Sequence, residues 1–396
     1  MGKKERPTIA IVLLATAFFL AVSEIGVRLI TRTSPETGMH LIGRVALLPY
    51  RPEAAAAQAS WEAAGNSTYL ARDEDLGWSI LANGGAGDVT ATAHGFRGAK
   101  NWATTASIPK GKIRISVYGD SFTHGDGVAL EDTWADQLQR LRPGLEVLNF
   151  GVPAYGTDQA LLRFRRDGRK FEAHFHLLGI WPENLVRNLS IVRFYLNPHG
   201  NLGTSKPRFE LVDGKLLLVN SPVMPKDVFL DTVLQRKVSP LVEKDYWYRD
   251  DEQRFLALYH AQAIRAALSV YQAYERRAER NRLYFAKDGE ALRVTVAIAE
   301  AFKREVEAGG ARAYVSIIPM RDLLEEHGSG AFPLAEMLRE RSVPLLDFGP
   351  AIASKAREMG AGALYRPDGH LSALGNRLIA EEINRRLSRE LEAALR

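Results

Sequence analysis

Short apolar runs alternate with amphipathic segments over most of the chain after residue 112. Five of these runs have the length of a strand: Ile113–Tyr118, Leu145–Asn149, His174–Ile180, Ala313–Ile318 and Pro344–Asp347. Helical spacing of apolar residues predicts helices over Thr133–Leu141, Thr157–Arg166, Ala291–Ala308, Leu334–Arg341 and Ser372–Leu395. Apolar strands separated by helices are typical of a parallel sheet covered on both faces. We therefore predict an α/β domain with a five-stranded parallel sheet over residues 111–396.

One segment, residues 193–281, departs from this alternation and is too long for a simple crossover. Within it, Arg208–Leu211 and Lys215–Val219 flank an Asp-Gly pair that predicts a hairpin. The stretch Asp251–Arg280 carries Tyr, Leu and Ala on one face and arginines on the other, which predicts a long helix. We interpret the segment as an insertion beside the active edge of the sheet. It is either a lid or partner surface, or a helical buttress that adds core.

The N-terminus combines positive charge with a long apolar run. Lys3, Lys4 and Arg6 precede the run Thr8–Val22, the pattern of an export signal or a membrane anchor. Ala21-Val22-Ser23 would serve as a cleavage site. The apolar pattern resumes beyond it to Ile30, which approaches the roughly 20 residues that span a bilayer. We predict an uncleaved anchor over residues 1–30, in a single-pass bacterial inner-membrane protein whose remaining chain lies in the periplasm or outside the cell.

Residues 31–110 lack the strand–helix alternation and are expected to form a linker and a loop-rich arm. Residues 54–64 are rich in alanine and predict a surface helix. The stretch 73–98 is rich in Gly and Asn, which predicts loops. Trp78 and Phe96 would anchor this arm on the main domain.

Composition narrows the function classes. The 396 residues carry a net charge of +5, and no block of Lys and Arg interleaves with aromatics, so nucleic acid is not an expected partner. An anionic polymer or membrane surface would suit the charge equally. The chain has no cysteine, which excludes disulfides, thiol catalysis and cysteine metal sites.

Four stretches carry the candidate chemistry, and each follows a predicted strand or precedes the last helix. They are Gly119-Asp120-Ser121, Asn149-Phe150-Gly151-Val152, Gly179 to Asn184, and Asp368-Gly369-His370. In an open α/β sheet, ligands bind at the carboxyl ends of the strands, so the four stretches are expected to meet in one crevice.

The residue types fit acyl transfer. Ser121 becomes a nucleophile when a base removes its proton, and His370 is such a base near neutral pH. Asp368 would orient the imidazole. The backbone N–H groups of Ser121 and Gly151 and the side-chain amide of Asn184 would stabilise the oxyanion. A Gly-Asp-Ser turn that merely caps a helix is the structural alternative.

These residues and their order resemble the SGNH, or GDSL-like, hydrolase superfamily. The resemblance implies a flavodoxin-like three-layer fold, Ser121, Gly151, Asn184 and His370 as the four catalytic residues, and no metal or organic cofactor. Leu76-Gly77-Trp78-Ser79 and His94 to Gly98 further resemble membrane-anchored bacterial members that add or remove acetyl groups on exported polysaccharides. Two positions depart from the family pattern. Pro367 stands where the aspartate usually lies, leaving Asp368 two residues before the histidine, and Leu185 replaces the acidic residue after the catalytic-type asparagine.

Three further residues are candidates for substrate contact. His124, three residues after Ser121, is expected to line the pocket, and Tyr155 and Trp181 would stack on a sugar or serve as core aromatics. His174 and His176 share a face of one strand, but no third ligand has zinc-site spacing, so a structural role is expected.

The sequence thus predicts a serine esterase or O-acyltransferase acting, through an acyl-enzyme on Ser121, on acyl (most simply acetyl) esters of an extracytoplasmic glycan. Its partners would be an acylated carbohydrate or other ester, the membrane, and polysaccharide-assembly proteins. The alternative is a non-catalytic glycan-binding or assembly protein on the same fold.

Overall fold

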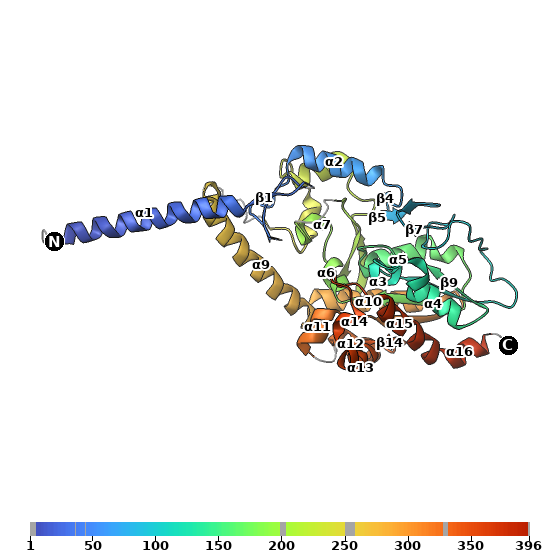
Figure 1. Ribbon diagram of the computed structural model, residues 1–396. Coiled ribbons are helices and arrows are strands. Elements are labelled where there is room, and N and C mark those ends of the chain that lie inside the picture. The colour runs from blue at the N-terminus through green and yellow to red at the C-terminus, as the bar shows by residue number, and fades with distance from the viewer. Residues whose placement is uncertain are drawn as a thin grey trace. The chain divides into compact units, whose positions relative to one another are not determined.

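The computed structural model describes residues 5–35, 37–43, 45–198, 203–249, 258–327 and 332–394. The chain divides into two compact units. The first consists of Met1–Glu62, Val192–Gly203 and Pro225–Glu279, and the second of Ala63–Ile191, Thr204–Met224 and Arg280–Arg396. Many of the elements of both are labelled in Figure 1.

The second unit is organised around a five-stranded parallel sheet. Its strands are β8 (Ile113–Tyr118), β9 (Leu145–Asn149), β10 (Phe175–Ile180), β13 (Arg312–Ile317) and β14 (Leu345–Asp347). The spatial order is β14-β13-β10-β8-β9, and every neighbouring pair is parallel. The chain therefore starts in the interior of the sheet, adds β9 on one side and then β10, β13 and β14 on the other. This is the flavodoxin-like order, and it confirms the predicted fold class.

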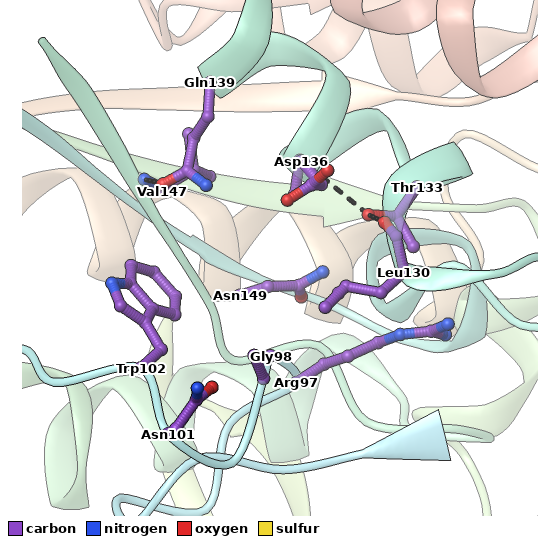
Figure 2. A pocket seen from close by; sticks show the side chains of 12 residues that line it. Arg97, Gly98, Asn101, Trp102, Leu130, Thr133, Asp136, Gln139, Val147 and Asn149 are labelled. Carbon is purple, nitrogen blue, oxygen red and sulfur yellow. Dashed lines mark hydrogen bonds between the residues drawn. The ribbon is translucent and has the colours of Figure 1, made fainter. Parts of the chain in front are cut away.

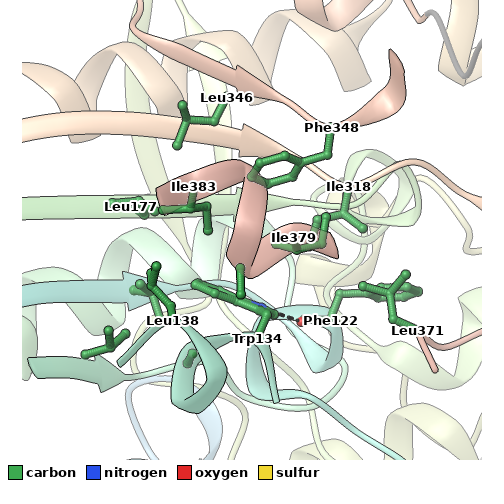
Figure 3. Packing of buried hydrophobic residues seen from close by; sticks show 14 of the residues in the cluster. Phe122, Trp134, Leu138, Leu177, Ile318, Leu346, Phe348, Leu371, Ile379 and Ile383 are labelled. Atoms are coloured by element: carbon green, nitrogen blue, oxygen red, sulfur yellow. Dashed lines mark hydrogen bonds between the residues drawn. The ribbon is translucent and has the colours of Figure 1, made fainter. Parts of the chain in front are cut away.

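The alternation of side chains along β8 builds one core face. Ile113, Ile115 and Val117 point to the same side and pack with α4 (Trp134–Leu141) and α15 (Ala373–Arg386). Figure 3 shows Trp134 and Leu138 from α4 facing Ile379 and Ile383 from α15 beside the strands, with Leu177 next to Ile383 and Leu346 above; all belong to one buried cluster. Helix α13 (Gly349–Met359) contributes Ile352 and Ala353 to it.

Helices α5 (Thr157–Arg166) and α10 (Glu290–Ala308) cover the opposite face. Here Tyr118, at the end of β8, packs against Phe164 and Phe302 with ring centroids 5.5 and 5.9 Å apart. His176 of β10 stacks on Tyr118 and is buried, which gives it the structural role expected for it. The sheet thus lies between two helical layers, as the sequence pattern predicts.

The remaining elements of this unit are shorter. They are β4 (Leu70–Asp73), β5 (Gly77–Ile80), β6 (Gly85–Ala86), β7 (Val89–Thr90), α3 (Ser121–His124), η1 (Leu130–Asp132), η2 (Gly168–Lys170), α6 (Glu183–Arg187), β11 (Arg208–Val212), β12 (Lys215–Val219), α11 (Arg321–His327), α12 (Pro333–Glu340), α14 (Ala361–Leu364) and α16 (Ser388–Ala393). The predicted hairpin is β11–β12, and Asp213 and Gly214 adopt the positive φ values that its two-residue turn requires. In the arm, Trp78 and Phe96 are both buried, as expected.

Two predicted helices differ from the structure. The closing helix does not run unbroken from Ser372: it breaks at Leu387, so that Leu387 and Leu391 turn into the core, and Ser372 serves as N-cap. The long helix of the insertion is α9 (Gln262–Phe285), and residues 251–257 of the predicted range lie outside the described residues. It begins at Gln262 because the Glu24 carboxylate accepts hydrogen bonds from the N–H groups of Gln262 and Ala263, an N-cap supplied from far away in the chain.

The first unit holds most of α9 together with α1 (Glu5–Ile30), β1 (Arg32–Thr33), β2 (His40–Ile42), β3 (Val45–Ala46), α7 (Arg193–Leu196), α8 (Lys226–Val233) and η3 (Pro240–Lys244). Helix α2 (Ala54–Gly65) crosses the boundary between the units. Within α1, residues Ile9–Ile30 have a mean hydropathy of 2.3 and none of them is buried, so the helix is long and apolar enough to cross a membrane. An export signal has the same length and composition.

Candidate active site

The nucleophile turn forms where β8 ends. Gly119 leads into Asp120, whose carboxylate caps α3 by accepting the Phe122 N–H at 2.9 Å, and Ser121 is the first residue of that helix. A side chain at Gly119 would collide with Thr123, and its Cβ would lie 2.9 Å from the Gly179 carbonyl oxygen of β10. Glycine is therefore required for the turn to pack between α3 and the neighbouring strand.

Ser121 and His370 meet although they are 249 residues apart. Ser121 Oγ lies 3.0 Å from His370 Nε2, within hydrogen-bonding distance. The imidazole is held by a turn in which the Arg366 N–H donates to the His370 carbonyl at 2.7 Å, and Gly369 takes a φ of +90° that favours glycine. Phe122 packs beside the ring at 5.2 Å. The two side chains are thus arranged as a hydroxyl and its base.

Asp368 lies beside His370 with a longer separation than a hydrogen bond. Its Oδ1 is 3.5 Å from His370 Nδ1 and accepts the His370 backbone N–H at 3.1 Å. Partial burial opposes ionisation, but the backbone N–H and the ring of His370 keep the pKa of Asp368 below its ordinary value. The carboxylate is half exposed. It is therefore negatively charged at neutral pH and close enough to stabilise an imidazolium, without fixing the ring as a buried carboxylate would.

The three predicted oxyanion donors differ in their hydrogen bonding. The Ser121 N–H has no acceptor among the described residues. The Gly151 N–H donates to Asn149 Oδ1 at 3.0 Å. The Asn184 amide donates both hydrogens, to Asp120 Oδ2 and to the Tyr155 carbonyl, each at 2.9 Å. Only the Ser121 donor is available without rearrangement; the other two must exchange an internal acceptor for a substrate oxygen.

The orientation of the Asn184 amide follows from its neighbours. Its Oδ1 accepts the Trp181 N–H at 2.6 Å, and a backbone N–H only donates. The Asp120 carboxylate and the Tyr155 carbonyl only accept. The opposite orientation would place oxygen against oxygen, so the assignment of nitrogen and oxygen is fixed by the network.

Arg187 is a site residue that the sequence analysis did not identify. Its Nη1 lies 3.2 Å from Asp120 Oδ2 and 3.1 Å from the Tyr155 carbonyl oxygen, in an interior where Asp120 is 2% exposed. Burial raises the pKa of Asp120, while Arg187 and the Asn184 amide counteract that rise. The sequence does carry a signal for Arg187. It is a basic residue three positions after the predicted catalytic asparagine, in the first turns after a strand.

Burial corrects the predicted substrate contacts of Tyr155 and His124. Tyr155 is fully buried, and its hydroxyl donates to the Trp78 carbonyl at 2.6 Å, so its ring presents no face to a sugar. His124 is 2% exposed; its Nε2 is 2.6 Å from the Tyr69 hydroxyl and its Nδ1 contacts Asp126. Burial lowers its pKa. His124 thus lies inside the protein as the last residue of the nucleophile helix, and Tyr155 is buried against Trp78.

Trp181 is half-buried at the end of β10. Its ring stacks on Phe122 with centroids 4.5 Å apart, and Phe122 in turn contacts the His370 ring. The Arg187 guanidinium lies 5.3 Å from the Trp181 ring centroid. Trp181 therefore remains a candidate for substrate contact, because only the ring of Phe122 lies between it and the ring of His370. Among the described residues, no group of three or more His, Asp or Glu side chains is arranged to hold a metal ion.

Fold and site together define an α/β protein with a flavodoxin-like sheet, in which a serine and a histidine lie within hydrogen-bonding distance at the carboxyl edge of the strands. The chain is similar, at low identity, to several solved structures. A member of the lipolytic G-D-S-L family from Veillonella parvula is 9% identical, with a TM-score of 0.35, over 70% of this chain and 99% of that one. A lipase/acylhydrolase from Enterococcus faecalis is 12% identical, with a TM-score of 0.36, over 70% and 96% of the two chains.

A catalytic mutant of an acetylxylan esterase from Geobacillus stearothermophilus is also 12% identical, with a TM-score of 0.36, over 70% of this chain and 94% of that one. No protein-family model matches the chain. No curated protein matches it either. Similarities at this level of identity and TM-score carry no information about activity. The activity proposed below therefore depends on the geometry of this chain's own site.

Proposed function

We propose that the protein is a serine esterase or O-acyltransferase that acts on acyl esters of an extracytoplasmic glycan. The observation that carries the proposal is the 3.0 Å distance between Ser121 Oγ and His370 Nε2 at the carboxyl edge of the sheet. A hydroxyl with a base at this distance is the minimal requirement for nucleophilic attack on a carbonyl.

The reaction proceeds in two steps. Ser121 Oγ bonds to the ester carbonyl carbon while its proton passes to His370 Nε2. The tetrahedral intermediate then expels the alcohol, which takes that proton and leaves an acyl-enzyme. Water or a sugar hydroxyl next gives its proton to His370 and bonds to the acyl carbon. The second tetrahedral intermediate then breaks its bond to Ser121 Oγ, which takes the proton back from His370, and the carboxylic acid or acylated sugar leaves. The Ser121 N–H stabilises the oxyanion from the start, and Gly151 and Asn184 join when their internal acceptors are exchanged.

A fluorophosphonate probe tests the nucleophile directly. The wild-type protein is expected to be labelled at Ser121 and to hydrolyse p-nitrophenyl acetate, and Ser121→Ala is expected to lose both properties while keeping its thermal unfolding temperature. Hydrolysis that persists in folded Ser121→Ala would refute this residue as the nucleophile. Incubation with an acetyl donor, with and without a glycan acceptor, followed by mass spectrometry of Ser121, then separates hydrolase from transferase.

One observation favours the alternative, a non-catalytic glycan-binding or assembly protein. Two of the three expected oxyanion donors are hydrogen-bonded inside the protein. An inert serine in such a site would not react with a fluorophosphonate, whereas a base-activated serine would. The same labelling experiment therefore decides between the two functions.

We also propose that α1 is an uncleaved anchor, with the sheet domain outside the cytoplasm. In support, α1 continues without interruption through Ala21-Val22-Ser23 to Ile30, and Glu24, just beyond this stretch, caps α9. Because the chain has no cysteine, a single Lys110→Cys variant offers a clean label. We expect Lys110→Cys to react with a membrane-impermeant maleimide in cells whose outer membrane is permeabilised. We also expect the purified protein to have an intact mass that includes residues 1–30. A mass that begins at Glu24, after Ala21-Val22-Ser23, would contradict the anchor.

A further inference from the structure

A pocket of about 320 Å³ lies beside α4 and the end of β9, apart from the Ser121–His370 pair. Figure 2 shows Trp102 and Asn101 on one side of it and the α4 side chains Asp136 and Gln139 on the other. Its volume is at the lower end of the range found for small-ligand sites, which suits a single ring.

The pocket has an aromatic platform. Trp102 is half-buried, and its indole packs edge-on against Phe96 with centroids 5.6 Å apart and an interplanar angle of 86°. Phe96 itself is fully buried, so the orientation of the indole is fixed from behind. A flat apolar surface that keeps one face towards a pocket is suited to the C–H face of a saccharide ring.

Hydrogen-bonding capacity remains unused around the pocket. Arg97 is 2% exposed, and its terminal nitrogens donate to the carbonyls of Gly125 and Val128 at 2.6 and 2.7 Å. Its Nε is buried and has no acceptor among the described residues. Gln139 accepts the Val147 N–H at 2.7 Å through Oε1, and no described acceptor takes its side-chain N–H groups. An unpartnered buried donor is costly, so its presence in a pocket wall favours a ligand that accepts hydrogen bonds.

Charge in the wall is balanced. The Asp136 carboxylate, whose Oδ2 is 2.7 Å from Arg140, lies across the pocket from Asn101, and Arg97 lines the side on which Asn101 lies. A neutral ligand with hydroxyl groups can donate to the carboxylate and accept from Arg97 and Gln139 at once. A strongly anionic or cationic ligand would meet a like charge.

The pocket adjoins the support of the nucleophile helix. Asn149 lines it and donates to the Thr123 carbonyl at 2.9 Å while accepting the Gly151 N–H at 3.0 Å. Arg97 holds the carbonyl of Gly125, where α3 ends. A ligand in this pocket therefore touches two side chains that bond directly to the backbone carrying Ser121.

We propose that this pocket is an accessory subsite for one neutral saccharide ring of the substrate glycan. The ring stacks on Trp102, its hydroxyls accept hydrogen bonds from Arg97 Nε and Gln139, and one hydroxyl donates to Asp136. The identification of the ligand as part of the substrate rests on the function proposed above. The proposal that this pocket binds a saccharide ring does not rest on that function, since it is argued from the residues of the pocket itself.

Binding is tested on the full detergent-solubilised chain carrying Ser121→Ala, which removes turnover. Xylopentaose, mannopentaose and their acetylated forms are titrated by isothermal titration calorimetry, a readout that does not depend on Trp102. We expect saturable binding of at least one probe, and an affinity at least tenfold lower in Trp102→Ala and in Asp136→Ala. The matched control is Tyr271→Ala, which removes an exposed aromatic side chain of α9 and is expected to keep the affinity.

Unchanged binding in a folded Trp102→Ala protein, or no binding of any of the four probes at millimolar concentration, overturns the proposal. Fluorophosphonate labelling of the wild-type protein is recorded in parallel. Labelling without saccharide binding leaves the enzyme function standing and removes the subsite. Saccharide binding that depends on Trp102 without labelling keeps the subsite and removes the enzyme function.

Discussion

Gly151→Ala is the most direct test of how tightly the nucleophile helix is placed. A Cβ at this position would collide with the backbone nitrogen of His124 and would lie 2.8 Å from the carbonyl carbon of Thr123 and 2.9 Å from the His124 Cα. These are backbone atoms of α3, the helix that begins with Ser121. To restore ordinary contact at 3.4 Å, α3 and Gly151 must separate by about 0.6 Å at Thr123 alone.

Such a shift acts on the reacting hydroxyl. A misplacement of about 1 Å can cost about 100-fold in rate, so we expect kcat/KM for p-nitrophenyl acetate to fall about 10- to 100-fold, or about 1.4–2.7 kcal/mol of barrier. Overpacking should also cost about 1–3 kcal/mol of stability. The matched control is Gly362→Ala, where a Cβ meets nothing within 4 Å and activity should be unchanged. A Gly151→Ala protein with wild-type activity and unfolding temperature would refute the close approach of Gly151 to α3.

Four further outcomes are expected. His370→Ala should lower esterase kcat by about 100- to 10,000-fold, as measured with p-nitrophenyl acetate, because the base is removed. Asp368→Asn should cost less than about tenfold in the same assay, since the carboxylate is half exposed and 3.5 Å from the ring; a loss as large as that of His370→Ala would contradict this. Arg187→Met should lower the free energy of unfolding by about 3–5 kcal/mol in denaturant titrations, because it leaves the buried Asp120 carboxylate unpaired. Burial lowers the pKa of His176 from 6.5 to about 4, so the unfolded chain binds a proton there that the folded protein does not. Between pH 7 and pH 5 the wild type should therefore lose about 2 kcal/mol of stability that His176→Phe retains, and equal losses in the two proteins would show that His176 is not the cause.

Much of the fold could be predicted because burial leaves a periodic signature. Ile113–Tyr118, Leu145–Asn149 and Thr157–Arg166 were bounded correctly, since strands covered on both faces read as continuous apolar runs and a helix covering a sheet reads as an amphipathic one. Local turn chemistry likewise predicted the hairpin around Asp213 and Gly214.

Where an element ends depends on partners outside it. Helix α9 begins at Gln262 because Glu24, more than 200 residues earlier, accepts from its first N–H groups. The closing helix breaks at Leu387, where Leu387 and Leu391 are buried in the core cluster against other parts of the chain. No periodicity within either segment carries this information, since the deciding contacts are made by other parts of the chain.

For the site, the sequence by itself determined which chemical groups are present and at which edge of the sheet they gather: a serine and a histidine, each in the loop that leads into a helix. The tertiary structure decided which of those groups are already hydrogen-bonded to one another. It engages the Asn184 amide and the Gly151 N–H internally, buries Tyr155 and His124, and brings in Arg187. Hydrogen bonds and burial depend on distances between residues far apart in the chain, and those distances exist only once the chain has folded.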